Sequence, residues 1–189
     1  MLIRILSFLL ETLFFVLIGS ALLRAWMNRL RINMSAQPGY FVMAVTDWLV
    51  KPLRRVLPKA VAQSRMDWAS VLAALLLALA YALLSVVLFC LLSGGLSALS
   101  AFGPGVLPGV LMFAVKMLAR VALQTAFVVV LVYAILSWVQ PGSMMLGLMG
   151  RLVEPMLAPL RRVIPVIGGL DLSALVLLLL LQIGLMILG

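Results

Sequence analysis

Histidine is absent from the sequence, and cysteine occurs once among its 189 residues. The single cysteine, Cys90, cannot form a disulfide framework or a cysteine-based metal site within the chain, and its apolar surroundings favour a small packing residue over a redox role. Without histidine, a cysteine pair or a nucleophile beside a base, the groups used in acid–base and nucleophilic catalysis are missing. The sequence therefore predicts a protein that is not an enzyme and that holds neither a metal nor a cofactor.

Charged residues are also scarce, at 10% of the chain, whereas 66% of the residues are hydrophobic and the mean hydropathy is +1.31. A soluble domain is closer to half apolar and a quarter charged. The 14 basic residues outnumber the 5 acidic ones, giving a net charge of +9. Because the basic residues flank apolar runs, this excess indicates anionic lipid and membrane topology, and no nucleic-acid partner is expected.

Four apolar runs are long enough, at about 1.5 Å per helical residue, to cross about 30 Å of hydrocarbon. They predict an all-α integral membrane protein with four transmembrane helices, at residues 5–26, 68–92, 110–138 and 171–188. The uncharged residues 93–109, rich in glycine, serine and proline, are predicted to form a loop on the outer side.

The first apolar run also has features of a signal peptide, because Arg4 precedes it and small residues lie at 19–21 near its end. Glu11, however, is unusual in the apolar part of a signal peptide, and the third run repeats the layout of the first. We therefore interpret the first run as a span.

A seven-residue phrase occurs twice, as Pro-Leu-Arg-Arg-Val-Leu-Pro at 52–58 and as Pro-Leu-Arg-Arg-Val-Ile-Pro at 159–165. This duplication predicts two tandem units, residues 1–92 and 110–189. In each unit an acid lies five residues before the first proline, and an aspartate opens the next apolar run. The earlier acids are Asp47 and Glu154, and the later aspartates, Asp67 and Asp171, are predicted N-caps of the second and fourth spans.

Each phrase is predicted to end a cytosolic amphipathic helix in the membrane plane, at 44–58 and 151–165. Pro52 and Pro159 should kink or restart these helices, and Pro58 and Pro165 should end them. The predicted apolar face of the first helix consists of Val45, Trp48, Leu49, Pro52, Leu53, Val56 and Leu57. That of the second consists of Leu152, Met156, Pro159, Leu160, Val163 and Ile164.

The predicted binding residues are the arginines and prolines of the two phrases. The arginines are Arg54, Arg55, Arg161 and Arg162, and the prolines are Pro52, Pro58, Pro159 and Pro165. A guanidinium binds phosphate or carboxylate through two parallel hydrogen bonds. Two partners remain open, namely lipid phosphate and the acids of the chain itself. A simpler interpretation is that the arginines only fix the topology, although topology alone requires neither the prolines nor their spacing.

Segments 27–66 and 139–170 hold ten of the fourteen basic residues. The positive-inside rule therefore places both arginine-bearing segments in the cytosol and both termini outside. Each unit has two crossings, so the two repeats are predicted to be parallel.

The doubled phrase, the Ile-Gly-Gly-Leu-Asp-Leu-Ser of residues 167–173 and the Arg-x-Trp of residues 24–26 resemble the YggT family, also called YlmG. This is a family of small bacterial and plastid membrane proteins built from one or two such units. The first copy departs from the family pattern after Pro58, where residues 59–66 replace a shorter Gly-Gly connection, so its cytosolic turn is expected to differ.

The resemblance implies no established enzymatic activity. It implies links to the biogenesis and cofactor assembly of photosynthetic membrane complexes in plastids, and to division, envelope and osmotic phenotypes in bacteria. Combined with the arginine faces, it predicts a non-catalytic scaffold or assembly factor of the bacterial inner membrane that binds anionic lipid or an acidic membrane-protein partner. A homo-oligomer is left open. The alternative is a small ion channel or transporter that contributes to osmotic or ion homeostasis.

One layer inside the membrane is predicted to contain polar residues from all four spans. These residues are Glu11, Thr12, Tyr81, Gln124 and Gln182. Arg120 lies about one turn further out and is expected to pair with Glu11. Ionisable residues at this depth are candidate functional sites, and the layer could line an ion or proton path. Interhelical hydrogen bonding is the simpler interpretation and carries the greater weight.

Overall fold

The computed structural model describes residues 1–32, 38–57, 67–92, 106–140, 142–162 and 171–188. Within these ranges the chain is helical apart from short connections, as the all-α prediction requires. The six helices, in chain order, are α1 (Leu2–Arg29), α2 (Gly39–Val56), α4 (Trp68–Leu92), α6 (Val106–Val139), α7 (Met144–Arg161) and α8 (Leu172–Leu188).

Three helices in the described part of the chain, α1, α4 and α6, are long and apolar enough to cross a membrane, whereas α8 is apolar but has 17 residues. The four helices overlap the four predicted spans. The predicted outer loop, residues 93–109, is too long at its C-terminal end, because residues 106–109 form the first turn of α6. Pro108 is compatible with that turn, since the N–H that a proline lacks would have no helical acceptor there.

The two amphipathic helices begin earlier than the sequence predicts. Helix α2 starts at Gly39, and α7 starts at Met144. The start of α7 has a recognisable signal, because Ser143 Oγ accepts a hydrogen bond from the backbone N–H of Leu146 at 3.1 Å, which is the geometry of an N-cap. The predicted terminators Pro58 and Pro165 lie outside the described residues, and α7 ends at Arg161.

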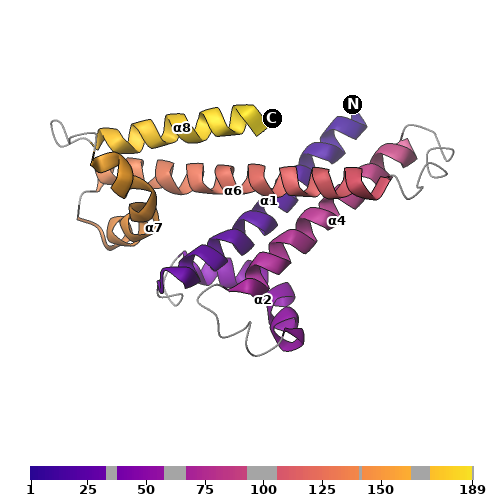
Figure 1. Cartoon of the computed structure of the whole chain (residues 1–189), viewed down its shortest axis with the longest axis horizontal. Helices are drawn as coiled ribbons and strands as arrows, with labels where there is room; N and C mark the ends of the chain where they lie inside the picture. Colours follow the sequence, from indigo (N-terminus) through magenta and orange to yellow (C-terminus); the bar gives the residue numbers. More distant parts are fainter. Residues whose placement is uncertain (33–37, 58–66, 93–105, 141, 163–170, 189) are drawn as a thin grey trace.

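Helices α1 and α4 lie side by side and antiparallel, while α6 crosses them and runs beside α8 (Figure 1). Several small side chains lie in the core that α1, α4 and α6 share, and they let the helix axes approach closely. These small residues include Ala21, Ala74, Ala78, Ala82 and Ala114. A Cβ atom on Gly19 of α1 would lie 2.9 Å from Thr125 Oγ1 of α6, so a larger residue there would force the Thr125 side chain to move.

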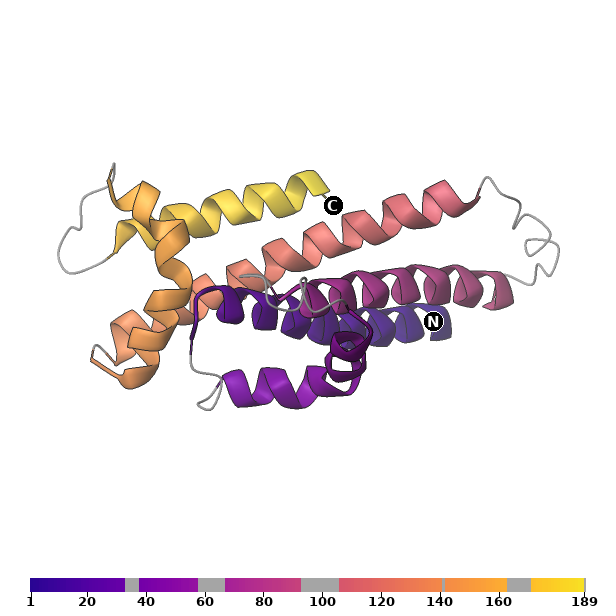
Figure 2. The same cartoon turned by 60° about the horizontal axis from the view of Figure 1, so that its bottom comes forward.

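Helices α2 and α7 occupy corresponding places in the two halves of the chain (Figure 2). Helix α2 follows α1 and packs on α1 and α4, and α7 follows α6 and packs on α6 and α8. Val50 of α2 is fully buried against α4, and Leu157 of α7 is fully buried in the core that α6 and α8 share. Both helices lie where the preceding long helix ends and the following apolar helix begins, so each half repeats one order of elements.

Helix α1 ends in a Schellman motif. The backbone N–H of Ile32 donates to the carbonyl of Met27 at 3.0 Å, and that of Arg31 donates to the carbonyl of Asn28 at 3.1 Å. Arg31 therefore adopts φ 53°, in the left-handed region where glycine is usual. Ile32 and Met27 are both buried, and their burial fixes the end of α1 against the second half of the molecule.

Candidate functional site: charged clusters on the amphipathic helices

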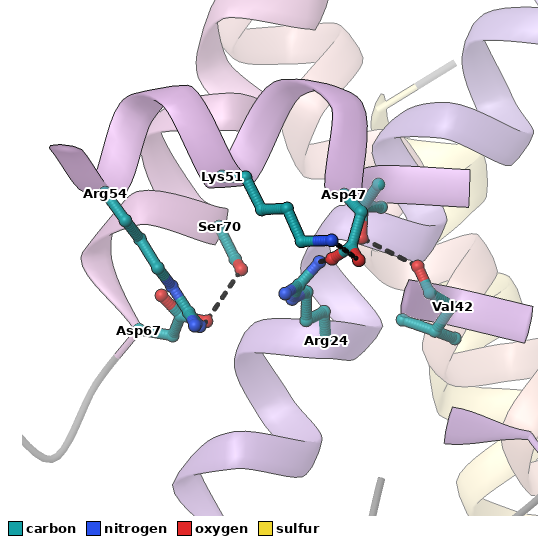
Figure 3. A network of polar contacts seen from close by, with 8 residues as sticks. Arg24, Val42, Asp47, Lys51, Arg54, Asp67 and Ser70 are labelled. Atoms are coloured by element: carbon teal, nitrogen blue, oxygen red, sulfur yellow. Dashed lines mark hydrogen bonds and ion pairs between the residues drawn. The ribbon is translucent and has the colours of Figure 1, made fainter. Parts of the chain in front are cut away.

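The first cluster joins the end of α2 to the start of α4 (Figure 3). Arg54 of α2 forms an ion pair with Asp67, the residue immediately before α4. Asp67 is buried and also accepts a hydrogen bond from Ser70 Oγ at 2.9 Å, while its backbone carbonyl accepts from the N–H groups of Ser70 and Val71. The pair fixes the end of α2 to the first turn of α4.

The second cluster joins α1 to α2 through an arginine that sequence analysis left out of the site. Arg24 is only 5% exposed, and its Nη1 donates to Thr46 Oγ1 at 2.7 Å and to Asp47 Oδ1 at 2.8 Å. Lys51 binds the other oxygen of Asp47, Oδ2, at 2.8 Å (Figure 3). The hydrogen bond from Lys51 and the nearby Arg24 lower the pKa of Asp47, although burial opposes the shift.

The third cluster is in the second half and centres on Arg161. Its guanidinium contacts Asp171 through Nε at 3.1 Å and Nη2 at 2.5 Å, Glu154 through Nη1 at 2.6 Å, and the hydroxyl of Tyr133 at 2.9 Å. One side chain therefore connects α6, α7 and the start of α8. Burial opposes the charge of Arg161, but the bonds to Asp171 outweigh it and raise the pKa of the guanidinium.

Asp171 precedes α8 and has the geometry of an N-cap, because its Oδ1 accepts the backbone N–H of Ser173 at 3.2 Å. The hydroxyl of Ser173 donates to the same oxygen. Burial alone would raise the pKa of Asp171, but the bonds from Ser173 and Arg161 hold it below its ordinary value. Asp67 and Asp171, which sequence analysis selected for their positions, thus also bind the first arginine of each phrase.

The second arginine of each phrase, Arg55 or Arg162, forms none of the contacts described for these clusters. Both are exposed, and neither forms an ion pair in the part of the chain that the structure describes. Their surroundings differ between the two helices. On α2 the exposed face that carries Arg55 includes Phe41 and Trp48. On α7 the exposed face that carries Arg162 includes Met144, Arg151 and Pro155.

The residues predicted to form the apolar face of α2 differ in their contacts. Leu49 and Leu53 pack against the protein, but Trp48 is 61% exposed and Val56 is 83% exposed. The prediction merged neighbouring residues such as 48 and 49 into one face, whereas consecutive helical residues point about 100° apart. Helix α2 therefore has an inner apolar face, an outer aromatic face and a charged edge between them.

The prolines inside the amphipathic helices do not end them. Pro52 lies within α2, and Pro159 lies within α7 together with Pro155. The ribbon of α2 changes direction towards its C-terminal end (Figure 2), as expected where a proline removes one hydrogen bond. Pro52 and Pro159 are both exposed.

Most of the predicted polar layer gathers around two cavities. One, of about 220 Å³, is lined by Glu11, Tyr81 and Arg120, and also by Lys116, which sequence analysis did not place in the layer. The other, of about 560 Å³, is lined by Arg120, Gln124 and Gln182.

Two details of the predicted layer differ from expectation. Thr12 Oγ1 donates to the carbonyl of Phe8 within its own helix, at 2.8 Å. The expected ion pair between Glu11 and Arg120 is not formed, since no such contact joins these two described residues although both line one cavity.

Trp26 connects the two halves of the chain. Its indole Nε1 donates to the backbone carbonyl of Leu152 in α7 at 3.1 Å. Two residues earlier on α1, Arg24 binds α2. The Arg-x-Trp motif therefore places both amphipathic helices against the end of α1.

Comparisons with known proteins agree with this arrangement. The family model described as CCB3/YggT matches residues 1–88 and 112–189, a split that falls between α4 and α6. The chain is 38% identical over 184 residues to an uncharacterized protein in the proC 3′ region of Vibrio alginolyticus, covering 97% of this chain and 92% of the relative. It is 34% identical over 181 residues to the uncharacterized protein YggT of Escherichia coli strain K12, covering 94% and 86%.

A more distant relative is the uncharacterized protein PA0392 of Pseudomonas aeruginosa, with 29% identity over 169 residues, covering 88% of this chain and 79% of the relative. No solved structure matches the chain.

Proposed function

The chain belongs to the CCB3/YggT family of membrane proteins, and from this premise we propose that it is a non-catalytic membrane scaffold or assembly factor that binds anionic headgroups through the outer faces of α2 and α7. One observation carries the proposal. In each repeat the first arginine is bound to an acid of the chain itself, whereas the second, Arg55 or Arg162, is exposed on the outer face. The first arginine positions the helix, and the second is left for an external anion.

The proposed topology has four crossings. At about 1.5 Å per residue, the 17 residues of α8 extend about 26 Å, which is close to the hydrocarbon thickness. Helices α2 and α7 lie at corresponding ends of the long helices (Figure 1). The concentration of basic residues at that end supports a cytosolic location for both amphipathic helices, with both termini outside the bacterial inner membrane.

The outer face of α2 has the chemistry of a membrane interface. Phe41 is 53% exposed and Trp48 is 61% exposed, and Arg55 lies on the same side of the helix. Aromatic rings favour the headgroup region, and each basic residue near an anionic surface contributes about 1 kcal/mol. The exposed aromatic side chains would be costly in water, so they favour a lipid surface over a purely topological role for the arginines.

The test compares lipid retention by the wild type and by the double variant Arg55→Gln/Arg162→Gln. The protein is purified in maltoside detergent with equal amounts of phosphatidylglycerol and phosphatidylcholine, and the retained lipids are counted by native mass spectrometry. The wild type should retain phosphatidylglycerol preferentially. The double variant should lose about 2 kcal/mol of that preference, or roughly tenfold or more in affinity.

Arg4→Gln removes an exposed charge from the opposite end of α1 and is the matched control, which should bind lipid as the wild type does. An unchanged phosphatidylglycerol preference in the double variant would refute headgroup binding. Cross-linking in native membranes, followed by mass spectrometry, tests the scaffold role. A partner that is lost only from the double variant would be held by the same arginines.

Passage of a small ion is the second candidate function. It is favoured by the two cavities around Arg120, because charged side chains inside membrane spans commonly mark ion pathways. In liposomes, Glu11→Gln should then abolish ion flux without unfolding the protein. Flux that is absent in the wild type, or equal in both, removes this candidate.

A further inference from the structure

Helix α6 carries a polar stripe within its apolar length. Lys116, Arg120 and Gln124 recur at intervals of four residues, so they lie on one face and extend over about 12 Å along the helix axis. The rest of α6 is apolar enough for it to rank among the candidate spans. A stripe of this kind inside lipid is costly unless its groups have polar partners.

The stripe faces cavities rather than a closed helix contact. Towards α1 and α4 it lines the smaller cavity, with Glu11 and Tyr81 opposite. Towards α8 it lines the larger cavity, with Gln182 opposite. Arg120 lines both cavities and so forms their shared wall. Four helices therefore contribute charged, amide or phenol groups to two cavities that share Arg120.

The charges around this space do not balance within the chain. Lys116 and Arg120 supply two positive charges and Glu11 supplies one negative charge. Among the described residues, neither cation forms an ion pair. A guanidinium, an ammonium and the two neighbouring side-chain amides are all hydrogen-bond donors, and this set of groups matches an oxyanion.

We propose that the two cavities form a binding site for a phosphate oxyanion, with Arg120 as the principal ligand and Lys116, Gln124 and Gln182 as further donors. Free phosphate and the phosphodiester of a lipid headgroup share this chemistry. The site lies near the middle of α6 and α4, whereas α2 and α7 follow the C-terminal ends of α1 and α6, so it is separate from their outer faces and does not depend on headgroup binding there. Binding does not require that the anion pass through.

The experiment measures thermal unfolding of the full chain in maltoside micelles, which contain no phosphate. One arm adds inorganic phosphate against potassium chloride at matched ionic strength, and the other adds phosphatidylglycerol. A ligand that binds only the folded state raises the melting temperature in proportion to the logarithm of its concentration, so one arm should give a rise of several degrees. A rise with phosphate identifies a free anion, and a rise with lipid alone that persists in Arg55→Gln/Arg162→Gln identifies a headgroup.

With phosphate, Arg120→Gln and Lys116→Gln should each abolish the rise, and with lipid each should abolish the part of the rise that Arg55→Gln/Arg162→Gln retains. Arg4→Gln should keep the rise in both arms, and Arg55→Gln/Arg162→Gln should keep the rise with phosphate, which separates this site from the proposed headgroup surface. If Arg120→Gln does not fold, Gln182→Leu on α8 tests the same cavity and should weaken the rise severalfold in ligand concentration. No rise in either arm, or an equal rise in the wild type and the cavity variants, would overturn the proposal.

Discussion

The amphipathic helices α2 and α7 have equivalent positions in the two repeats, but different ion pairs hold them there. In the first repeat two arginines bind the two acids: Arg24 binds Asp47, and Arg54 binds Asp67. In the second repeat Arg161 alone binds both equivalent acids, Glu154 and Asp171. A duplicated sequence phrase therefore does not imply a duplicated contact network. The difference arises because the charge that Arg24 provides on α1 has no counterpart in the corresponding part of α6.

The equivalent acids, Asp47 and Glu154, also differ in how exposed they and their arginine partners are. The Asp47 side chain is 29% exposed and pairs with an Arg24 side chain that is 6% exposed, whereas the Glu154 side chain is 55% exposed and pairs with an Arg161 side chain that is 31% exposed. A buried ion pair that loses one partner leaves a stranded charge, but an exposed pair is screened by water. The same kind of substitution should therefore have very different consequences in the two repeats.

The largest expected effect is that of Asp47→Ala, which leaves Arg24 buried beside Thr46 and without a carboxylate. We expect it to lower the free energy of unfolding by about 3 kcal/mol. Glu154→Ala should cost about 1 kcal/mol or less. Both are measured by equilibrium unfolding in mixed dodecyl sulfate micelles.

The control for Asp47→Ala is the double variant Arg24→Met/Asp47→Ala. It removes both partners and should recover most of the lost stability, since no buried charge remains. Equal costs for Asp47→Ala and Glu154→Ala would show that the buried pair does not hold α2 more firmly than the exposed pair holds α7.

The next effect compares the first arginine of each phrase. Arg161→Gln breaks contacts to α6, α7 and the start of α8 at once, and should cost about 2 kcal/mol. Arg54→Gln breaks one pair whose arginine side chain is 46% exposed, and should cost about 1 kcal/mol. Proteolysis of α7 and α2 in the two variants measures which helix detaches. Preferential release of α2 in both variants would contradict the division of roles.

Much of this arrangement can be predicted from the sequence, for identifiable reasons. The long apolar helices follow from the long apolar runs, and Asp171 is recognisable as an N-cap because it is the last charge before such a run. The equal placement of α2 and α7 follows from the repeated phrase. Periodicity also identifies Leu49 and Leu53 as packing residues.

Other features depend on which side chain reaches which neighbour, and periodicity carries no such information. Adjacent arginines have the same chemistry, so the sequence does not reveal that Arg54 pairs with Asp67 whereas Arg55 forms no ion pair among the described residues. Arg24 resembles a topological charge at the end of a span until the approach of α2 makes it a buried contact. Lys116 was missed because the layer was counted along single helices, whereas the cavity depends on how α6 crosses α1 and α4.

A smaller effect concerns how the free energy of unfolding changes at acidic pH. The pKa values of Asp47 and Asp171 are lowered in the folded state, so their contribution to stability is present above the ordinary value of about 4. That contribution is lost as the pH falls through this value towards the lower folded pKa. Unfolding measured between about pH 6 and about pH 3 should show declining stability. Asp171→Asn should reduce the decline but retain the part that Asp47 causes, and an identical decline in the variant would exclude Asp171 as a source.

The smallest effect concerns the connections after the two long helices, where each repeat has a residue with positive φ. In the second repeat it is Gly142, at φ 108°, which suits glycine, whereas in the first it is Arg31, at φ 53°. Arg31→Gly should relieve strain and raise the free energy of unfolding by about 0.5–1 kcal/mol, and Gly142→Ala should lower it by about 1 kcal/mol or more.

Arg31→Ala removes the same charge but keeps the strain, so it should leave stability nearly unchanged. Because these substitutions act on the backbone, their effects should persist at every pH, unlike those of the acid pairs. A gain from Arg31→Ala equal to that from Arg31→Gly would assign the effect to charge, and the two repeats would then differ in electrostatics alone.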